Sequence, residues 1–205
     1  MNLEWLIIKY LWIAIFAVVL LWSGINPKDQ LTWLLEVAPA LIAAALMAFT
    51  YNSFRLTPVL YLLILIHSIV LMIGGHYTYA EVPFFDNLFG WERNNYDKVG
   101  HFLQGFVPAL VAREILIRKQ VVSGTAWLNL FVISICLAFS AFYELIEWWV
   151  ALASDEAADA FLGTQGYVWD TQSDMFLALI GACSCLILLS RHHDRALQQL
   201  SEKSW

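Results

Sequence analysis

Charged residues are scarce in this sequence: only 14% of the 205 residues are Asp, Glu, Lys or Arg, whereas 60% are hydrophobic. A soluble domain carries about 25% charged residues, so the composition excludes an ordinary soluble domain and predicts an integral membrane protein. Basic residues are scarcer than acidic ones, and the net charge of -6 argues against a nucleic-acid partner, which would require a basic surface.

Familiar catalytic signatures are also missing. The sequence has no serine nucleophile elbow, phosphate-binding loop, Cys-x-x-Cys pair or His-Glu-x-x-His motif. All three cysteines lie in apolar runs, and Cys183 and Cys185 are two positions apart, which places them on different sides of a helix; the third is Cys136. We expect them to serve packing rather than redox or metal chemistry.

Long apolar segments, by contrast, are abundant. Six of them approach the ~20 residues that a helix needs to cross a bilayer. The first is not followed by an Ala-x-Ala cleavage site, so we expect it to be a retained helix. We predict an all-α fold in which residues 1–205 form a single polytopic membrane domain, a bundle of six transmembrane helices. The predicted helices are 3–22, 31–49, 56–73, 99–117, 126–150 and 171–189.

The distribution of Lys and Arg predicts the orientation of this bundle. By the positive-inside rule, the side with the excess of basic residues is cytoplasmic, and here it includes both termini. That side carries Lys9, Arg55, Arg113, Arg118, Lys119, Arg191, Arg195 and Lys203, and the opposite side carries Lys28, Arg93 and Lys98.

The longest connection, residues 74–96, is rich in aromatic residues. Aromatic side chains favour the membrane interface, so we expect this segment to lie along it as a cap. Its aromatic residues are Tyr77, Tyr79, Phe84, Phe85, Phe89, Trp91 and Tyr96.

Ionisable residues lie in or at the ends of three of the predicted helices. Because such residues are costly inside a bilayer, they suggest a functional site. In each helix they form a pair three or four positions apart, so both side chains project from one helix face. With the predicted orientation, all three pairs lie near the outer membrane face, and His101, Glu144 and Asp174 lie ~5–8 Å beneath the interface. They are Asp97 with His101, Glu144 with Glu147, and Asp170 with Asp174; Gln104, Glu36 and His76 are expected beside them.

This convergence predicts a polar pocket that opens outward, with two chemistries left open. Histidine with carboxylates is a ligand set for Zn²⁺, Mn²⁺ or Fe²⁺, and such a metal can activate water to hydrolyse a phosphate or acyl ester. The protein would then be a metal-dependent hydrolase or transferase of a lipid or lipid-linked envelope substrate. Alternatively, carboxylates that share protons would serve a proton- or cation-coupled transporter or a non-catalytic binding protein. The candidate catalytic residues are Asp97, His101, Glu144, Glu147, Asp170 and Asp174, of which His101, Glu144, Glu147 and Asp174 are the expected metal ligands.

Structural roles are the competing interpretation. Asp97 and Asp170 start helices, where an acid satisfies free N–H groups. The two glutamates end a helix, where an acid opposes the helix dipole, so only hydrogen bonding between helices would explain them structurally. We expect His67, in the middle of a helix, to make such an interhelical bond, and the His192-His193 pair in the tail to be solvated.

These motifs resemble the YjdF family of bacterial inner-membrane proteins, classed as a domain of unknown function. The likeness covers nearly the whole chain, and it implies a multi-pass protein of the bacterial inner membrane without supplying a reaction. More distantly, the order of the motifs is similar to VanZ-like proteins, associated with glycopeptide tolerance, although Glu147 replaces the usual Gln and Ala178 the usual Asn. The motifs are Asp97-Lys98-x-x-His101, Tyr143-Glu144-x-x-Glu147-Trp148, and Trp169-Asp170-Thr171-x-x-Asp174-Met175 with Gly181.

Overall fold

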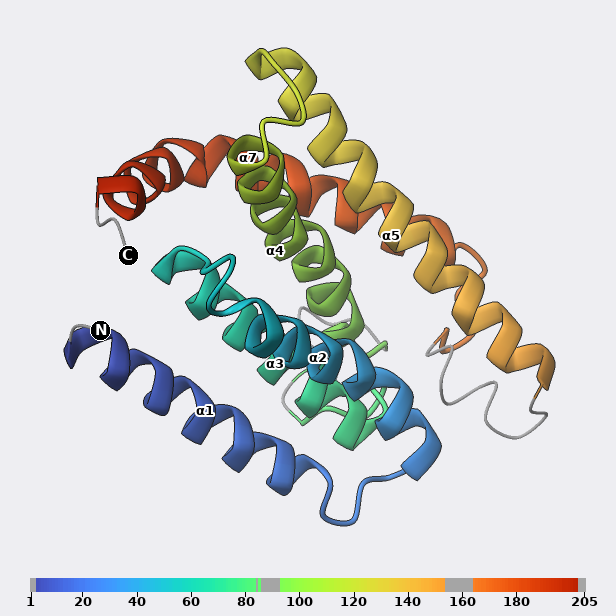
Figure 1. Ribbon diagram of the computed structural model, residues 1–205. Coiled ribbons are helices and arrows are strands. Elements are labelled where there is room, and N and C mark those ends of the chain that lie inside the picture. The colour runs from blue at the N-terminus through green and yellow to red at the C-terminus, as the bar shows by residue number, and fades with distance from the viewer. Residues whose placement is uncertain (1–2, 84, 86–92, 154–163, 203–205) are drawn as a thin grey trace.

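The fold is a bundle of helices (Figure 1). The computed structural model describes residues 3–83, 85, 93–153 and 164–202, and within them it contains six α-helices and no strand. The all-helical prediction is therefore confirmed. The helices are α1 (Leu3–Ser23), α2 (Gln30–Thr50), α3 (Pro58–Tyr77), α4 (Tyr96–Arg118), α5 (Thr125–Ala153) and α7 (Asp170–Glu202).

Five of these six helices are long and apolar enough to cross a membrane, and α4 is the exception. It carries acidic and basic residues at both of its ends. Its position accounts for this difference from the prediction, because α4 packs against α3, α5 and α7. A helix surrounded by other helices faces little lipid, so its charged side chains can meet polar partners inside the protein. The central helix α4 is thus the one without a span-length apolar stretch.

Two glycines allow α4 and α7 to cross in close contact. A Cβ atom added to Gly105 would collide with the backbone of Ala178, and one added to Gly181 would collide with the backbone of Phe102. Small residues that let backbones approach closely are the usual means of packing helices in membranes. The crossing fixes how the first turns of α4 and α7 face each other.

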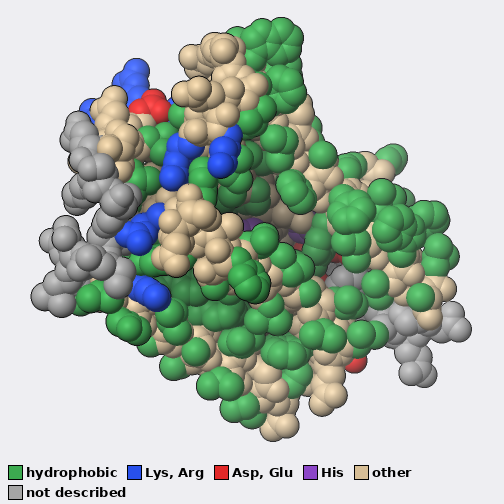
Figure 2. All heavy atoms as spheres, viewed as in Figure 1, with side chains coloured by type: hydrophobic (Ala, Val, Ile, Leu, Met, Phe, Trp, Pro, Cys, Tyr) green, Lys and Arg blue, Asp and Glu red, His purple; other side chains and the backbone are tan. Residues whose placement is uncertain are grey.

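Among the described residues, the apolar side chains form two large cores and a smaller aromatic cluster around Tyr79 and Tyr96. One core is shared by α3, α4, α5 and α7 and includes the fully buried Leu60, Leu110 and Val132. The other joins α1 and α2 to α3. Many large apolar side chains nevertheless face outward, among them Phe49, which is 86% exposed. Figure 2 shows a surface dominated by hydrophobic side chains, as expected for lipid contact, with Lys and Arg gathered toward the end that holds both termini.

The aromatic segment that follows α3 packs onto the bundle. Tyr79 is buried, with its ring between Gly74 of α3 and Gly100 of α4. The ring of Phe85 meets that of Tyr96 edge-on, with centroids 5.0 Å apart. Phe84, Phe89 and Trp91 lie outside the described residues, so the predicted interfacial cap stays a prediction.

Helix α7 continues to Glu202, well past the predicted end at residue 189. The prediction was based on apolar length, which limits only the part of a helix that crosses the hydrocarbon. The last turns of α7 carry charged and polar residues and extend the helix beyond its apolar stretch. This extension brings His193 back onto α4, while its neighbour His192 is exposed.

Candidate functional site

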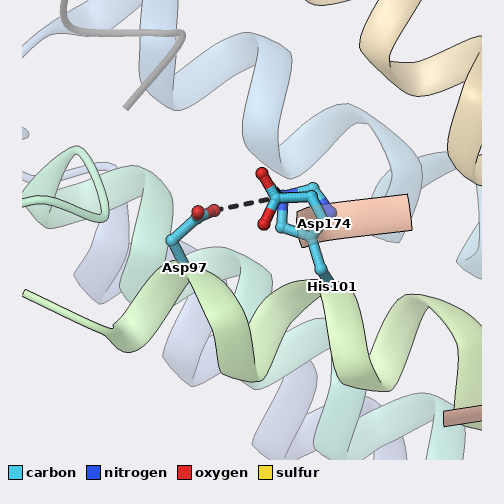
Figure 3. Close-up of side chains that lie close together, drawn as sticks. All are labelled: Asp97, His101 and Asp174. Atoms are coloured by element: carbon cyan, nitrogen blue, oxygen red, sulfur yellow. Dashed lines mark ion pairs between the residues drawn. The ribbon is translucent and has the colours of Figure 1, made fainter. Parts of the chain in front are cut away.

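The first turns of α4 hold the imidazole ring at the centre of the site (Figure 3). The Nε2 atom of His101 lies 3.2 Å from Oδ1 of Asp97, one turn earlier. The Nδ1 atom lies 2.9 Å from Oε1 of Gln104, so Nδ1–H donates to this amide oxygen. Nε2 is therefore the nitrogen that faces carboxylates from two helices. Asn95 is the N-cap residue of α4 but makes no side-chain cap hydrogen bond, and Asp97 lies in the first turn, where the helix dipole favours an acid.

Acidic side chains from α7 and α5 approach opposite sides of this ring. On the Nε2 side, Oδ2 of Asp174 lies 3.9 Å away. On the Nδ1 side, Oε1 of Glu144 lies 3.9 Å away. Of the four predicted ligands, Asp174 groups with His101 and with Asp97, which was not predicted to be a ligand, whereas Glu144 and Glu147 form a second group with His101. In each group the ligand atoms lie within 4.8 Å of one another.

An arginine that the sequence analysis did not assign to the site joins two of its acids. Nη2 of Arg93 lies 2.5 Å from Oδ1 of Asp170 and 3.4 Å from Oδ2 of Asp97. Its guanidinium also lies 5.4 Å from the centre of the Tyr167 ring. The spacing of four between Arg93 and Asp97 was a signal for this pairing, although Arg93 precedes α4. This arginine holds the starts of α4 and α7 together.

Two hydrogen bonds between Asn94 and Gln165, which we call the clasp, join the connection before α4 to the connection before α7. The backbone N–H of Asn94 donates to Oε1 of Gln165 at 3.0 Å, and Nε2 of Gln165 donates to the carbonyl of Asn94 at 3.0 Å. The side chains of the cluster are almost fully covered, with exposed fractions of 8% for His101, 7% for Glu144 and 4% for Asp174. Cavities of about 510 and 430 Å³ lie elsewhere, at the α4–α5 and α1–α2 connections. The described side chains of the cluster are too little exposed to show the outward-opening pocket, which stays a prediction.

A further acid and a tyrosine extend the cluster toward α2. Glu36 is 5% exposed, and its Oε2 accepts a hydrogen bond of 2.9 Å from the hydroxyl of Tyr143 on α5. The Tyr143 ring centre lies 6.5 Å from that of His101, edge-on. The expectation that Glu36 lies in the same layer as the three pairs agrees with this position.

Among the described residues, the cluster contains more acid than the cations in contact with it can neutralise. Six buried carboxyl groups from four helices meet here: Glu36, Asp97, Glu144, Glu147, Asp170 and Asp174. The cations in contact with them are the Arg93 guanidinium and, if protonated, the His101 ring. Within the described part of the chain, Oε1 of Glu144 and Oδ1 of Asp174 are buried without a hydrogen-bond partner. Buried carboxylates without a counter-charge are costly, so these groups require protons or a bound cation.

Two other histidines were assigned positions from the sequence, His76 in this layer and His67 in the middle of its helix. Nδ1 of His76 bonds with the carbonyl of Ser23 at 2.9 Å, and its ring lies 4.8 Å from that of Trp22. Nε2 of His67 is buried with no hydrogen-bond partner among the described residues, so the structure does not give this atom the interhelical bond we predicted. Neither histidine belongs to the two metal-compatible groups.

The prediction that His193 is solvated is wrong. The side chain is fully buried, its Nε2–H donates to Oε2 of Glu114 at 2.9 Å, and its Nδ1 accepts from Nη1 of Arg113 at 2.9 Å. Glu114 also accepts from the hydroxyl of Thr57 at 2.8 Å and from Arg118 at 2.7 Å. The sequence placed this histidine in a polar tail, but the extended α7 turns it toward α4. A second buried polar network therefore exists at the opposite end of α4.

Comparison with known proteins agrees with a membrane protein of this kind. Residues 8–195 match the family described as "Predicted membrane protein (DUF2238)". The chain belongs to this family. It is 53% identical over 186 residues, or 89% of both chains, to a protein of Escherichia coli (strain K12) named "Inner membrane protein YjdF". No solved structure matches.

Membership in the DUF2238 family confirms the predicted resemblance and the location. The chain is a multi-pass protein of the bacterial inner membrane in a family whose description states no reaction. The more distant likeness to VanZ-like proteins is not among these findings and stays a prediction. At one of the two positions that depart from that pattern, Ala178 is fully buried against Gly105 at the α4–α7 crossing.

Proposed function

We propose that the cluster around His101 binds a divalent metal ion, and that the protein is a metal-dependent hydrolase or transferase of a lipid or lipid-linked envelope substrate. The observation that carries the proposal is the approach of Asp97 and Asp174 to Nε2 of His101, at 3.2 and 3.9 Å. Tetrahedral ligand atoms about 2.0–2.1 Å from a zinc ion stand roughly 3.3 Å apart. The three ligand atoms therefore need only small movements to bind one ion.

The hydrogen bond that Nδ1 of His101 makes supports Nε2 as the metal-binding nitrogen. A metal-binding histidine normally donates its second N–H to an oxygen acceptor, which fixes the tautomer and the ring orientation. Gln104 provides that acceptor for Nδ1–H. We accordingly favour His101, Asp97 and Asp174 as the ligand group, with Glu144 and Glu147 on the opposite side of the ring as proton acceptors.

The chemistry follows from this division of roles. A bound cation would polarise a phosphate or acyl oxygen and make a water molecule acidic enough to attack it. Among the described residues, Oε1 of Glu144 is buried without a hydrogen-bond partner. Glu144 also lies on a different helix from the three ligands, so it is suited to accept a proton. Arg93, at the outer margin, offers a positive charge to an anionic substrate. Such a substrate would enter by displacing the clasp between Asn94 and Gln165.

A proton- or cation-coupled transporter is the second candidate, and the position of Glu36 favours it. This acid and Tyr143 continue the line of polar groups toward α2, away from the three ligands. A hydrolase does not need this extension, whereas a relay of protons requires several acids in sequence.

Metal stoichiometry in the detergent-purified protein tests the first candidate. Wild type should hold about one metal ion per chain, and His101→Ala or Asp174→Asn should remove most of it. The double variant should lose little more metal than either single variant, as for residues that act as one unit. Gln104→Ala should weaken metal binding by about 10–100-fold, as for partners that orient a ligand.

The matched control is Asp194→Asn, which makes the same change at a side chain that is 51% exposed, far from the cluster. It should keep the full metal content. If gently purified wild type contains no metal and rebinds none, the enzyme proposal gives way to transport, which proton uptake by reconstituted vesicles would then test.

A further inference from the structure

The end of the bundle opposite the His101 cluster carries a separate group of basic and aromatic side chains. They come from the beginning of α1, the α2–α3 connection and the end of α4, and we call them the basic-aromatic patch. Its members are Lys9, Tyr51, Phe54, Arg55, Arg118 and Lys119.

Two cations meet at the first ring of the patch. Nζ of Lys9 lies 4.9 Å from the centre of the Tyr51 ring, and Cζ of Arg55 lies 4.5 Å from it. Both distances are within the ~6 Å over which a cation is attracted to an aromatic face. Lys9 and Arg55 are far apart in the sequence, so the fold has gathered these charges around one ring.

The second ring repeats this arrangement with residues of α4. Cζ of Arg118 lies 3.8 Å from the centre of the Phe54 ring, and Nζ of Lys119 lies 5.4 Å from it. Arg118 is fixed further by bonds of 2.6 Å to the carbonyl of Arg55 and 2.7 Å to Oε1 of Glu114. The patch is therefore an ordered feature of the fold.

The patch has an excess of positive charge. Among the described side chains, its ion pair with an acid is the one between Arg118 and Glu114. The sequence contains no Asp or Glu from residue 37 to residue 80, which includes the whole α2–α3 connection. Lys119 is exposed, and Lys9 and Arg55 are partly exposed. An anion that reached this end of the bundle would meet several basic side chains together.

The position of the patch identifies the kind of anion. α2 ends at Thr50 and α4 at Arg118, so the charges lie at the level where apolar helices leave the hydrocarbon. Next to them, Phe49 is 86% exposed, Leu46 58% and Leu11 57%, as expected for side chains that face lipid tails. A soluble anion would use the charges but not the apolar side chains.

We propose that the basic-aromatic patch is a binding site for an anionic phospholipid, with its phosphate held by Lys9, Arg55 and Lys119. The acyl chains lie against the exposed apolar side chains of α1 and α2. Basic pockets between transmembrane helices are a known means of binding such headgroups. The site is distinct from the His101 cluster and does not depend on the function proposed for it.

Lipid titration of the full chain in a zwitterionic detergent, followed by native mass spectrometry, tests this proposal. Dioleoyl phosphatidylglycerol should bind at least tenfold more tightly than dioleoyl phosphatidylcholine. The variant Lys9→Gln/Lys119→Gln should weaken phosphatidylglycerol binding by about thirty-fold, given the usual contribution of each basic side chain at an anionic surface. The matched control Arg191→Gln/Arg195→Gln removes the same charge from exposed positions near the same end and should change the affinity less than twofold.

Three outcomes would overturn the proposal. Equal losses in the two double variants would show that net charge, rather than the patch, attracts the lipid. Equal binding of both phospholipids would exclude headgroup recognition, and protection from thermal unfolding by inorganic phosphate alone would identify a soluble anion as the ligand. If Lys9→Gln/Lys119→Gln does not fold, the headgroup preference of wild type and its loss at high salt decide the question.

Discussion

Replacing Glu114 by Gln should cost more free energy of unfolding than the loss of ordinary hydrogen bonds between membrane helices. The side chain is fully buried, and both of its oxygens accept hydrogen bonds. Oε1 faces Arg118, and Oε2 faces Thr57 and His193. Glutamine keeps the size but has one oxygen, so in either orientation its NH₂ group faces a donor.

The magnitude separates two physical descriptions of this network. If the contacts were independent hydrogen bonds between membrane helices, losing two of them would cost about 1.2 kcal/mol, at about 0.6 kcal/mol each. If they form a buried charge network, removing the buried carboxylate of Glu114 leaves the Arg118 guanidinium uncompensated and costs about 3–5 kcal/mol. The full burial of Glu114 and His193 favours the larger value.

Unfolding of the purified protein in mixed micelles of increasing denaturing detergent, followed by tryptophan fluorescence and circular dichroism, measures this difference. Asp194→Asn is the control, because Asp194 pairs with Arg113 in the same network but is 51% exposed; its cost should stay below about 1 kcal/mol. A coupling of about 0.5–3 kcal/mol is expected between Glu114→Gln and His193→Ala. A Glu114→Gln variant as stable as Asp194→Asn would refute the reasoning.

Three further predictions concern packing, topology and a helix cap. Gly105→Val should cost about 1–3 kcal/mol or more in the same unfolding assay, because its side chain would collide with the backbone of Ala178; a neutral effect would contradict the close crossing. A periplasmic phosphatase reporter fused after Lys119 should be inactive, since the positive-inside rule makes this connection cytoplasmic, and an active fusion would reverse the orientation. Asp29→Ala should cost about 1 kcal/mol, because Oδ1 of Asp29 accepts from the backbone N–H of Thr32 at 2.6 Å at the start of α2. The bond with that N–H holds the Asp29 pKa below its ordinary value, so its contribution should be complete at neutral pH and lost as the pH falls through the lowered value, which thermal unfolding at several pH values would detect.

Several features of the site were predictable because they depend on chain order alone. Successive membrane helices alternate in direction, so the start of α4, the end of α5 and the start of α7 must lie at one side of the membrane. The acidic pairs sit at those helix ends, and spacings of three or four place each pair on one helix face. Their proximity around His101 in the structure agrees with this expectation. Their role as a site is still a prediction.

The partners of individual atoms were not predictable in the same way. Arg93 was counted only as an outward charge, and His193 was expected in water. Both assignments depend on how each helix is rotated against its neighbours, which a pattern within one segment does not contain. The tail of α7 illustrates this. Its polar composition is equally compatible with a solvated, irregular segment and with a helix that packs on Glu114.

The sequence by itself therefore determined the membrane character, the six helices and the side of the bundle on which the acids collect. These properties follow from composition, segment length and alternation of direction. The tertiary structure alone decided which carboxylates face Nε2 of His101, which cation joins Asp97 to Asp170, and that α4 is the central helix. The physical reason is the contact between α4 and α7 at Gly105 and Gly181, because close backbone packing sets the rotation and depth of each helix and so the positions of all its side chains.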